Sequence, residues 1–459
     1  MCSRVGSGSS THRLSRLRPG LASITTPQLD ILVFGLNFAP EPTGTGRYTG
    51  ETAAWLARRG HRVTAIVGLP HYPQWRVYQG YSRAGVLREN LEGVDVWRVP
   101  HFVPPVTRLT GASRLRMDLH FGLSAARYWI PRLFAAGRPD VVMAVAPPLI
   151  VGFYPILYRL RGVPWLLHLQ DLQVDVALQL GMLRNVLMRK MLPSIEGFIL
   201  RRATAVSTIT EAMRRRVISK GARPDRVFVF PNWADIDMVR PAARENSFRA
   251  ELGIGPDHIL VMYAGAFGVK HGLDVLVEAA AHLVGEEKLH IVLIGHGADR
   301  ARVEELAYRL RLRNVQFLDV QPAERLPEVL AAADIHLVLQ KRRAADLVMP
   351  SKLGNILASG RPCIATADPG TALHDLVGGC NLGLVCPPED PAALASAILR
   401  LASDPGLRLT LGQRARSYAE ENLGKEIILK DFEERLAALA RRTDAPRADT
   451  GRTTKKDRS

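Results

Sequence analysis

Short apolar runs of strand length alternate with amphipathic stretches along most of the chain. In the first half, runs rich in Val, Ile and Leu stand at residues 29–34, 62–67, 140–146, 163–169, 204–208 and 226–230. The alternation restarts in the second half, with apolar runs at residues 259–263, 290–294, 315–318 and 335–339. Buried strands separated by helices are typical of parallel sheets built from βαβ units. The pattern therefore predicts an α/β chain with two doubly wound, Rossmann-like sheets.

The chain length favours two domains, since 459 residues exceed what one hydrophobic core usually serves. We expect an N-terminal Rossmann-like domain over residues 29–237 and a C-terminal one over residues 238–424. A last helix, residues 425–443, is expected to pack back on the first domain. Residues 1–28 and 444–459 are polar and basic, and we expect both segments to be disordered.

The composition is that of a folded protein, with 47% hydrophobic and 23% charged residues. Prolines interrupt the longest uncharged apolar run, residues 141–157, so no membrane-spanning helix is predicted. Residues 1–28 lack the apolar core of a secretory signal. Four cysteines without metal-site spacing predict reduced thiols in a cytosolic protein, namely Cys2, Cys363, Cys380 and Cys386.

The formal net charge of +17 is concentrated in a few segments. Two are the tails, and two lie in the first half, at residues 101–139 and 181–220, where Arg and Lys are mixed with large apolar residues. Helices of that kind bind anionic bilayers, which predicts a cytoplasmic protein peripheral to the inner membrane face. Ordinary amphipathic helices with solvated arginines are the alternative. Nucleic acid is not expected as a partner, because no binding module is recognisable.

Polar and glycine residues follow two apolar runs of the first half, where a ligand crevice would form. Gly44 and Gly46 follow the first run and, lacking a Cβ, would let a ligand approach the backbone. A Gly-x-Gly pair alone leaves a dehydrogenase or an epimerase equally open. His168, near the end of the fourth run, and Asp171 and Asp175, which follow it, are candidate site residues. A structural histidine with satisfied hydrogen bonds is the alternative for His168.

Glycine turns recur in the second half beside cations. The loop from Gly265 to Gly272 carries Lys270, and the next strand ends at Gly295-His296-Gly297. Glycine loops of both halves, with Lys270 and Lys352, are expected to converge on a central cleft between the domains.

A short helix is expected between Pro350 and Gly360, followed by an apolar strand. Ser351 is expected to cap this helix and Leu353 to lie on its apolar face. The first turn would then present N–H groups and a positive helix end beside Lys352, which suits a nucleotide diphosphate. An ordinary surface helix is the alternative.

Asp235 and Asp237 could hold a hard cation, since two carboxylates in this spacing can share one. They lie in a linker without a third acid nearby, so we expect a structural turn and no metal site.

Several motifs together resemble the retaining nucleotide-sugar glycosyltransferases of family four, which have the two-Rossmann-domain GT-B fold. The similarity extends over roughly residues 29–440, and its branch includes the colanic-acid biosynthesis fucosyltransferase. The motifs are Asn37 to Gly50, His71 to Val77, Phe230 to Trp233, Gly265 to Gly272, and Met349 to Lys352.

The resemblance implies a GDP- or UDP-sugar donor held mainly by the second domain, an acceptor held by the first, retention of configuration, and no metal or other cofactor. It implies that Lys270 and Lys352 contact the diphosphate, and we expect these two lysines to be catalytic, together with Asp171 and His168, which are candidates from their place at the end of a strand. It assigns donor binding to Gly44, Gly46, Gly265, Gly295, Gly297, Ser351, Leu353 and Asn355.

One departure concerns two glutamates that many relatives carry eight residues apart. Leu347 and Asn355 stand at these positions here. The usual contact with the donor sugar is therefore in doubt, while Asn355 is expected to bond the ribose.

The resemblance implies transfer of a sugar, with fucose as the candidate, to a polyprenyl-diphosphate-linked oligosaccharide in bacterial exopolysaccharide synthesis. A nucleotide-sugar epimerase of the same two-domain architecture is the alternative enzyme. A non-catalytic protein that binds nucleic acid through its basic tails is the alternative outside enzymes.

Overall fold

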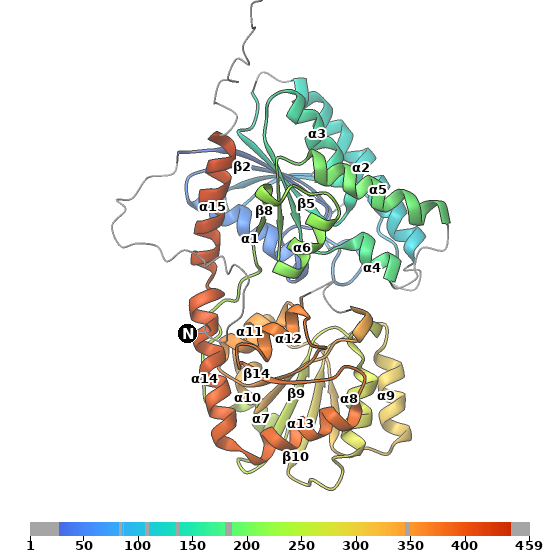
Figure 1. The fold of residues 1–459 in the computed structure, drawn as a ribbon, viewed down its shortest axis with the longest axis vertical. Helices are drawn as coiled ribbons and strands as arrows, with labels where there is room; N and C mark the ends of the chain where they lie inside the picture. Colours follow the sequence, from blue (N-terminus) through green and yellow to red (C-terminus); the bar gives the residue numbers. More distant parts are fainter. Residues whose placement is uncertain are drawn as a thin grey trace, which may run out of the picture. The chain divides into compact units, whose positions relative to one another are not determined.

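The computed structural model describes residues 27–81, 85, 87–105, 110–134, 137–179, 186–344 and 349–441. These residues form one eight-stranded sheet and one six-stranded sheet, each with its own helices (Figure 1). The predicted α/β class with two Rossmann-like sheets is confirmed. Residues 1–26 and 444–459, expected to be disordered, lie outside the described residues.

The N-terminal sheet is mostly parallel. Its strands are β1 Asp30–Gly35, β2 Arg62–Gly68, β3 Leu87–Leu91, β4 Val94–Val99, β5 Val141–Ala146, β6 Trp165–Leu169, β7 Ala205–Thr208 and β8 Val227–Val229. They follow the order β3-β4-β2-β1-β5-β6-β7-β8, and β1 pairs in parallel with both β2 and β5. Every residue of β5 and β6 is buried, as in strands that helices cover on both faces.

Helices of this half connect the parallel strands. They are α1 Gly44–Arg58, α2 Gly111–Phe134, α3 Phe153–Leu160, α4 Gln173–Gln179, α5 Val186–Arg202 and α6 Glu211–Ser219. The two basic segments predicted at residues 101–139 and 181–220 therefore hold α2, α5 and α6. No helix in the described part of the chain is long and apolar enough to cross a membrane.

The antiparallel pair β3–β4 was not predicted. Arginine, glutamate and asparagine fill the middle of β3, and its residues are exposed or half-buried. An edge strand of this kind has no apolar period for sequence reasoning to find.

The C-terminal sheet is parallel throughout its described pairings. Its strands are β9 Ile259–Ala264, β10 Leu289–Ile294, β11 Val315–Leu318, β12 Ile335–Val338, β13 Cys363–Thr366 and β14 Gly383–Cys386. The strand order is β11-β10-β9-β12-β13-β14. The predicted boundary between residues 237 and 238 falls between β8 and this sheet, and it stays a prediction.

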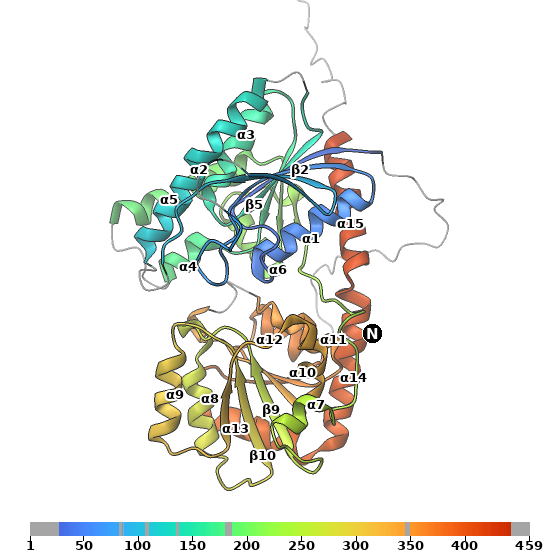
Figure 2. The same ribbon diagram turned by 180° about the vertical axis from the view of Figure 1, so that it is seen from behind.

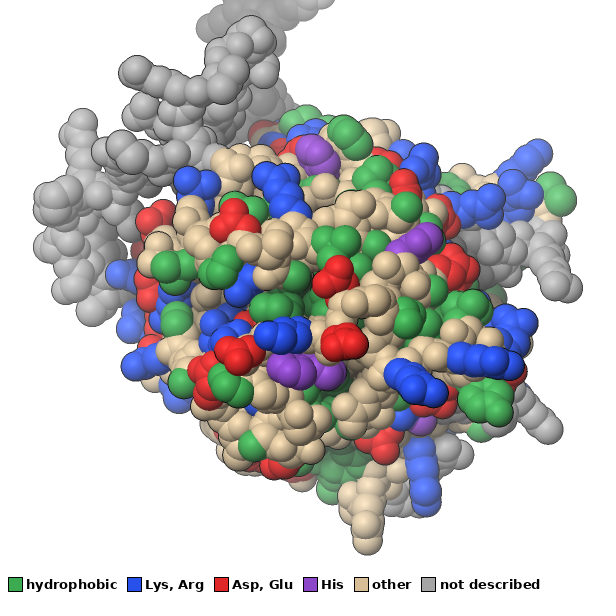
Figure 3. Space-filling view, turned by 90° about the horizontal axis from the view of Figure 1, so that it is seen from below, with side chains coloured by type: hydrophobic (Ala, Val, Ile, Leu, Met, Phe, Trp, Pro, Cys, Tyr) green, Lys and Arg blue, Asp and Glu red, His purple; other side chains and the backbone are tan. Residues whose placement is uncertain are grey.

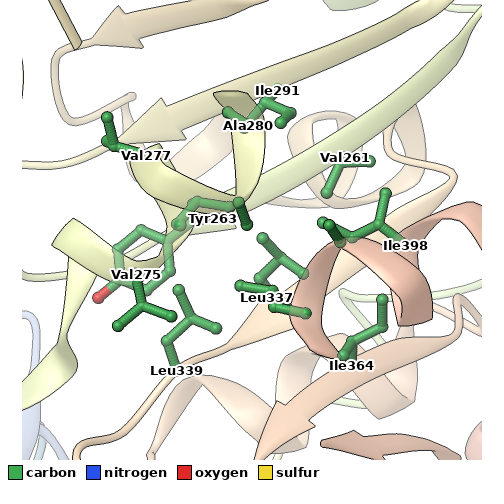
Figure 4. Packing of buried hydrophobic residues seen from close by; sticks show 14 of the residues in the cluster. Val261, Tyr263, Val275, Val277, Ala280, Ile291, Leu337, Leu339, Ile364 and Ile398 are labelled. Carbon is green, nitrogen blue, oxygen red and sulfur yellow. The ribbon is translucent and has the colours of Figure 1, made fainter. Parts of the chain in front are cut away.

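Helices also surround the C-terminal sheet, and in both views α8 and α9 lie side by side (Figure 1 and Figure 2). The helices are α7 Ser247–Glu251, α8 Leu273–Ala281, α9 Arg300–Arg309, α10 Leu326–Ala332, α11 Lys352–Ala358, α12 Ala372–Val377, α13 Pro391–Ser403 and α14 Pro405–Asn422. The core between α8, α13 and the strands is built from Val, Ile, Leu and Ala, with Tyr263 at its margin (Figure 4).

The last helix, α15, runs from Lys425 to Arg441. Its Glu433 is buried and bonds to the His61 ring at 2.9 Å and to the Arg59 guanidinium at 3.3 Å. Because these two residues lie between α1 and β2, the helix is joined to the N-terminal sheet's first βαβ unit.

Surface charge is mixed on the face viewed from below in Figure 3, where basic, acidic and hydrophobic side chains are interspersed. The described cysteines are free thiols, and burial raises the pKa of both Cys363 and Cys386 to about 12.

Candidate functional site

Two glycine turns of the C-terminal half pack backbone against backbone at the carboxyl ends of β9 and β10. The N–H of Gly265 donates to the carbonyl oxygen of Ile294, and the N–H of Phe267 donates to that of His296, each at 2.9 Å. A Cβ on Gly295 would collide with the carbonyl oxygen of Gly265. These glycines therefore bring the two loops together, which shapes the predicted nucleotide turn before any ligand is present.

Lys352 places its ammonium group inside this loop cluster. Its Nζ lies 3.4 Å from the centre of the Tyr263 ring and 3.5 Å from where a Cβ on Gly265 would stand. The Nζ is buried and has no hydrogen-bond partner among the described residues, although the lysine stem is half-buried. A Cβ at residue 265 would be in ordinary contact with the ammonium, so the ammonium packs directly against this glycine turn.

An unpaired buried cation is costly in a folded protein. A desolvated cation–π contact stabilises by about 2 kcal/mol. Burying a charge without a counter-ion costs several kcal/mol. Burial accordingly lowers the pKa of Lys352 well below its ordinary value. The arrangement suits an anionic ligand that supplies both the missing charge and the missing hydrogen-bond acceptor.

Tyr263 holds the lysine from the core side. Its ring packs beside Val275 and Leu339, with the hydroxyl at the edge of the cluster (Figure 4). The hydroxyl donates to the carbonyl oxygen of Ala266 at 2.8 Å, and burial raises the pKa of Tyr263. The phenol therefore stays neutral and offers the ammonium only the face of its ring.

Lys270 supplies a second cation on the same glycine loop. It lies exposed in the one-turn 3₁₀ helix from Val269 to His271, and its carbonyl oxygen accepts from the N–H of Lys341. Burial first, and then the charges of Lys352 and Lys270, lower the pKa of His271 to about 3. The glycine loop thus carries Lys270 beside a neutral imidazole, while the other cation, Lys352, comes from α11.

The start of α11 differs from the prediction in two respects. Ser351 is exposed, has helical dihedral angles (φ −61°, ψ −24°) and makes no capping bond through its side chain, so its predicted role as a cap is wrong. The N–H of Leu353 already donates to the carbonyl oxygen of Pro350 at 3.0 Å. Asn355 is half-buried on the same helix, and Leu347 lies outside the described residues.

The two glycines of the N-terminal half have different surroundings. Gly44 opens α1 with a φ of +63°, and a Cβ there would lie 3.6 Å from Cε1 of Tyr72. A Cβ on Gly46 would collide with the Glu41 carboxylate. Gly44 therefore has a backbone that favours glycine, and Gly46 makes room for Glu41. The expectation that both glycines approach a ligand stays a prediction.

Glu41 is a buried residue that sequence reasoning missed. Its Oε1 accepts from the N–H groups of His71 and Tyr72, each at 3.0 Å, and its Oε2 accepts from the side-chain amide of Asn37 at 2.9 Å. The carboxylate thus fastens the loop after β2 to the loop after β1. The only sequence signal was an acid between two prolines in a glycine-rich motif.

His168 lies within β6, one residue before the strand ends, and Asp171 follows the strand. His168 is fully buried, and burial lowers its pKa to about 3. Such an imidazole is neutral at pH 7. Efficient general bases have a pKa near the working pH, so His168 would be an inefficient one. A hydrogen-bonding role suits it better than proton abstraction. Asp171 is half-buried.

Asp175 is a structural residue. Its buried carboxylate pairs with Arg216 at 2.8 Å and with Lys220, which also pairs with buried Glu196 at 2.5 Å. This network joins α4, α5 and α6, so Asp175 is satisfied by protein partners.

Asp235 and Asp237 make only local bonds, within the turn that contains them, among the described residues. Asp235 Oδ1 accepts from the N–H of Met238 at 2.9 Å, and Asp237 pairs with Arg240 at 3.0 Å. The expected structural turn is confirmed. The prediction that donor loops of both halves meet at one cleft stays a prediction.

Family comparisons match both halves of the chain. The family described as "Glycosyl transferase 4-like domain" matches residues 43–233, and that described as "Glycosyl transferases group 1" matches residues 244–418. An Escherichia coli (strain K12) protein named as the colanic acid biosynthesis glycosyl transferase WcaI is 37% identical, over 88% of this chain and 98% of that protein. A Pseudomonas aeruginosa protein named as glycosyltransferase WbjE is 26% identical, over 65% of this chain and 74% of its own.

Solved structures share the fold. Sucrose-phosphate synthase from Thermosynechococcus elongatus aligns with a TM-score of 0.69 at 20% identity, covering 90% of this chain and 99% of its own. WaaG, a glycosyltransferase involved in lipopolysaccharide biosynthesis, aligns with a TM-score of 0.62 at 18% identity, covering 88% of this chain and 99% of its own. At these identities the likeness concerns the two-sheet architecture alone.

Proposed function

Because the chain belongs to the family 4 glycosyltransferases of the GT-B fold, we propose that it moves a sugar from a GDP- or UDP-sugar to a lipid-linked oligosaccharide. The relative's name assigns that protein to colanic acid biosynthesis, and we propose bacterial exopolysaccharide synthesis for this chain. Fucose is the candidate sugar. The observation that carries the donor proposal is the buried, unpartnered ammonium of Lys352 beside the glycine turns.

The diphosphate of the donor would be the anion that this ammonium lacks. As the bond between the sugar C1 and the phosphate oxygen breaks, negative charge grows on the leaving diphosphate. A cation held in place beforehand stabilises that charge more in the transition state than in the ground state. Lys352 would act from inside the site, and Lys270 from the exposed loop.

No protein nucleophile is needed in this scheme. The acceptor hydroxyl bonds to C1 on the face that the diphosphate leaves, and its proton passes to a phosphate oxygen. The configuration at C1 is then retained. The low pKa of His168 supports this scheme, because it makes that side chain an inefficient base. We propose that the reaction needs no metal, since lysines take the role that a divalent cation would otherwise have.

A lipid-linked acceptor would require the enzyme to visit the inner membrane face. In both ribbon views α2 and α3 lie side by side (Figure 1 and Figure 2). Several of their large apolar side chains are exposed, among them Leu123 at 73%, Phe134 at 79% and Leu160 at 81%. Exposed apolar residues beside arginines suit an anionic bilayer. We propose that this surface binds the membrane reversibly.

The donor is tested first by thermal shift with GDP-fucose, UDP-glucose and UDP-galactose. Only a ligand that binds the folded state raises the midpoint temperature of thermal unfolding. Transfer to a prenyl-diphosphate-linked sugar is then followed with wild type and Lys270→Ala, and we expect Lys270→Ala to lower turnover by about 100-fold or more. An unchanged rate would remove Lys270 from the mechanism.

Glycosyl transfer is preferred to the epimerase alternative because the relative that spans nearly the whole chain is named a glycosyl transferase. Conversion of the sugar nucleotide to its epimer without any acceptor would contradict this choice.

A further inference from the structure

The loop after β2, residues 69–81, carries several aromatic side chains and is fastened by hydrogen bonds within it. The N–H of Tyr78 donates to the carbonyl oxygen of Pro70 at 3.0 Å, and the Tyr78 hydroxyl donates to that of Tyr72 at 2.7 Å. Glu41 accepts from the N–H of Tyr72. Trp75, which stands between these two tyrosines, is therefore presented by a loop fastened on both sides.

Trp75 has a strained backbone, with a φ of +54°. Bulky residues rarely adopt this left-handed conformation, and it costs about 1–3 kcal/mol. The indole is half-buried and meets the His71 and Tyr72 rings at 5.8 and 6.2 Å between centroids. Glycine or asparagine would fit this position with less strain. The loop thus keeps a tryptophan that its backbone geometry disfavours.

Arg114, in the first turn of α2, lies against this tryptophan. The centre of its guanidinium is 4.9 Å from the Trp75 ring centroid. Stacking uses the flat face of the guanidinium and leaves its N–H edges able to donate. In the described parts of the chain no acidic side chain pairs with Arg114, and the residue is exposed.

The pair borders the glycine turn of the N-terminal half. Tyr72, which contacts the Trp75 ring, is also the residue nearest to where a Cβ on Gly44 would stand, at 3.6 Å. The loop after β2 and the loop after β1 both leave the carboxyl edge of the sheet, where open α/β sheets bind ligands.

We propose that Trp75 and Arg114 form an acceptor subsite for an anionic saccharide. One sugar ring packs its C–H face on the exposed part of the indole, because these hydrogens carry partial positive charge and the aromatic face is negative. A carboxylate or phosphate of the same glycan accepts hydrogen bonds from the edge of Arg114. This inference rests on the proposed glycosyl transfer and adds a charge requirement on the acceptor.

Binding is tested without donor, by saturation-transfer difference NMR with three probes of equal chain length. The probes are hexyl glucoside, hexyl glucuronide and hexyl diphospho-glucose. The proposal expects at least one anionic probe to bind wild type about tenfold more tightly than the neutral probe. Whether the glucuronide or the diphosphate probe gains more identifies carboxylate or phosphate as the anion.

Two variants separate the roles of the pair. Arg114→Gln should abolish the preference for anionic probes. Trp75→Asn should weaken all three probes about tenfold or more, while its thermal midpoint equals or exceeds that of wild type because asparagine tolerates positive φ. Donor-induced thermal shifts should be unchanged in both variants.

The proposal is overturned if wild type binds all three probes equally or binds none. It is also overturned if Trp75→Asn lowers the midpoint and leaves probe binding unchanged, as a structural tryptophan would. Failure of the proposed function would look different, since the anionic probes would bind while no sugar nucleotide shifts the midpoint.

Discussion

The ammonium of Lys352 lies 3.4 Å from the centre of the Tyr263 ring, buried and without a hydrogen-bond partner in the described residues. A methionine in place of the lysine keeps the length of the side chain and removes the buried charge. We expect Lys352→Met to raise the free energy of unfolding of the ligand-free protein by about 1–3 kcal/mol, the cost of a buried unsatisfied polar group. Urea denaturation measures this, and the same variant should lose the thermal shift given by the sugar nucleotide.

Lys220 offers a matched control, because it is also largely buried but pairs with Asp175 and Glu196. Lys220→Met leaves buried Glu196 without a cation and Asp175 with Arg216 alone, so it should lower the free energy of unfolding by about 3–5 kcal/mol. Opposite signs for the same substitution would show that Lys352 is placed for a ligand. Equal losses in both variants would mean that Lys352 stabilises the fold.

A pH dependence follows from the buried lysine. Burial lowers the pKa of Lys352 in the folded state, whereas in the unfolded state it has the ordinary value near 10.5. Between the two pKa values the unfolded chain carries a proton on Lys352 more often than the folded chain does. The free energy by which Lys352 destabilises the fold therefore becomes smaller as the pH rises. The stability advantage of Lys352→Met over wild type should therefore be smaller at pH 9.5 than at pH 7. Denaturation of both proteins at the two pH values checks this, and a constant difference would contradict it.

Glycine substitutions distinguish loop packing from ligand contact. A Cβ on Gly295 collides with the backbone of Gly265, so Gly295→Ala should lower the free energy of unfolding by about 3 kcal/mol or more. Gly255 has no atom nearer than 3.7 Å to such a Cβ, and Gly255→Ala should be neutral or slightly stabilising. If Gly295→Ala retained full stability and lost only donor affinity, the packing role would be wrong.

The sequence pattern predicted the buried strands well, because a run of apolar residues between amphipathic helices has few other stable structures. The last helix was expected over residues 425–443, and α15 runs from Lys425 to Arg441. Three strands were missed: β3, whose charged and half-exposed residues carry no apolar period, and the partly buried strands β4 and β14.

Side-chain roles were harder to predict than elements. Asp175 was a candidate site residue by its position after β6, but its partners Arg216 and Lys220 are 41 and 45 residues away along the chain. Glu41 likewise bonds to residues 30 and 31 positions away. Such pairings depend on the packing of separate elements, which periodicity does not describe. The cations Lys270 and Lys352 were identified because each stands in a recognisable glycine or helix-start motif.

If α2 and α3 bind the membrane, replacing their exposed leucines should weaken binding to anionic vesicles. Replacing exposed leucines by aspartate removes about 1.5–3 kcal/mol of apolar burial each and adds repulsion from anionic lipid. Leu123→Asp with Leu160→Asp should therefore reduce flotation with phosphatidylglycerol vesicles at least about tenfold. Turnover of a soluble, short-chain acceptor should be unchanged, because neither leucine belongs to the candidate site.

Leu409 on α14 is a suitable control, since it is 64% exposed but lies outside this surface. The Leu409→Asp protein should float with the vesicles as well as wild type does. Salt should weaken the binding of wild type to anionic vesicles, because arginines of α2 contribute to it. Neutral vesicles should recover less protein than anionic ones. Equal recovery of wild type and the double variant, or equal recovery with neutral and anionic lipid at low salt, would show that α2 and α3 do not bind the membrane.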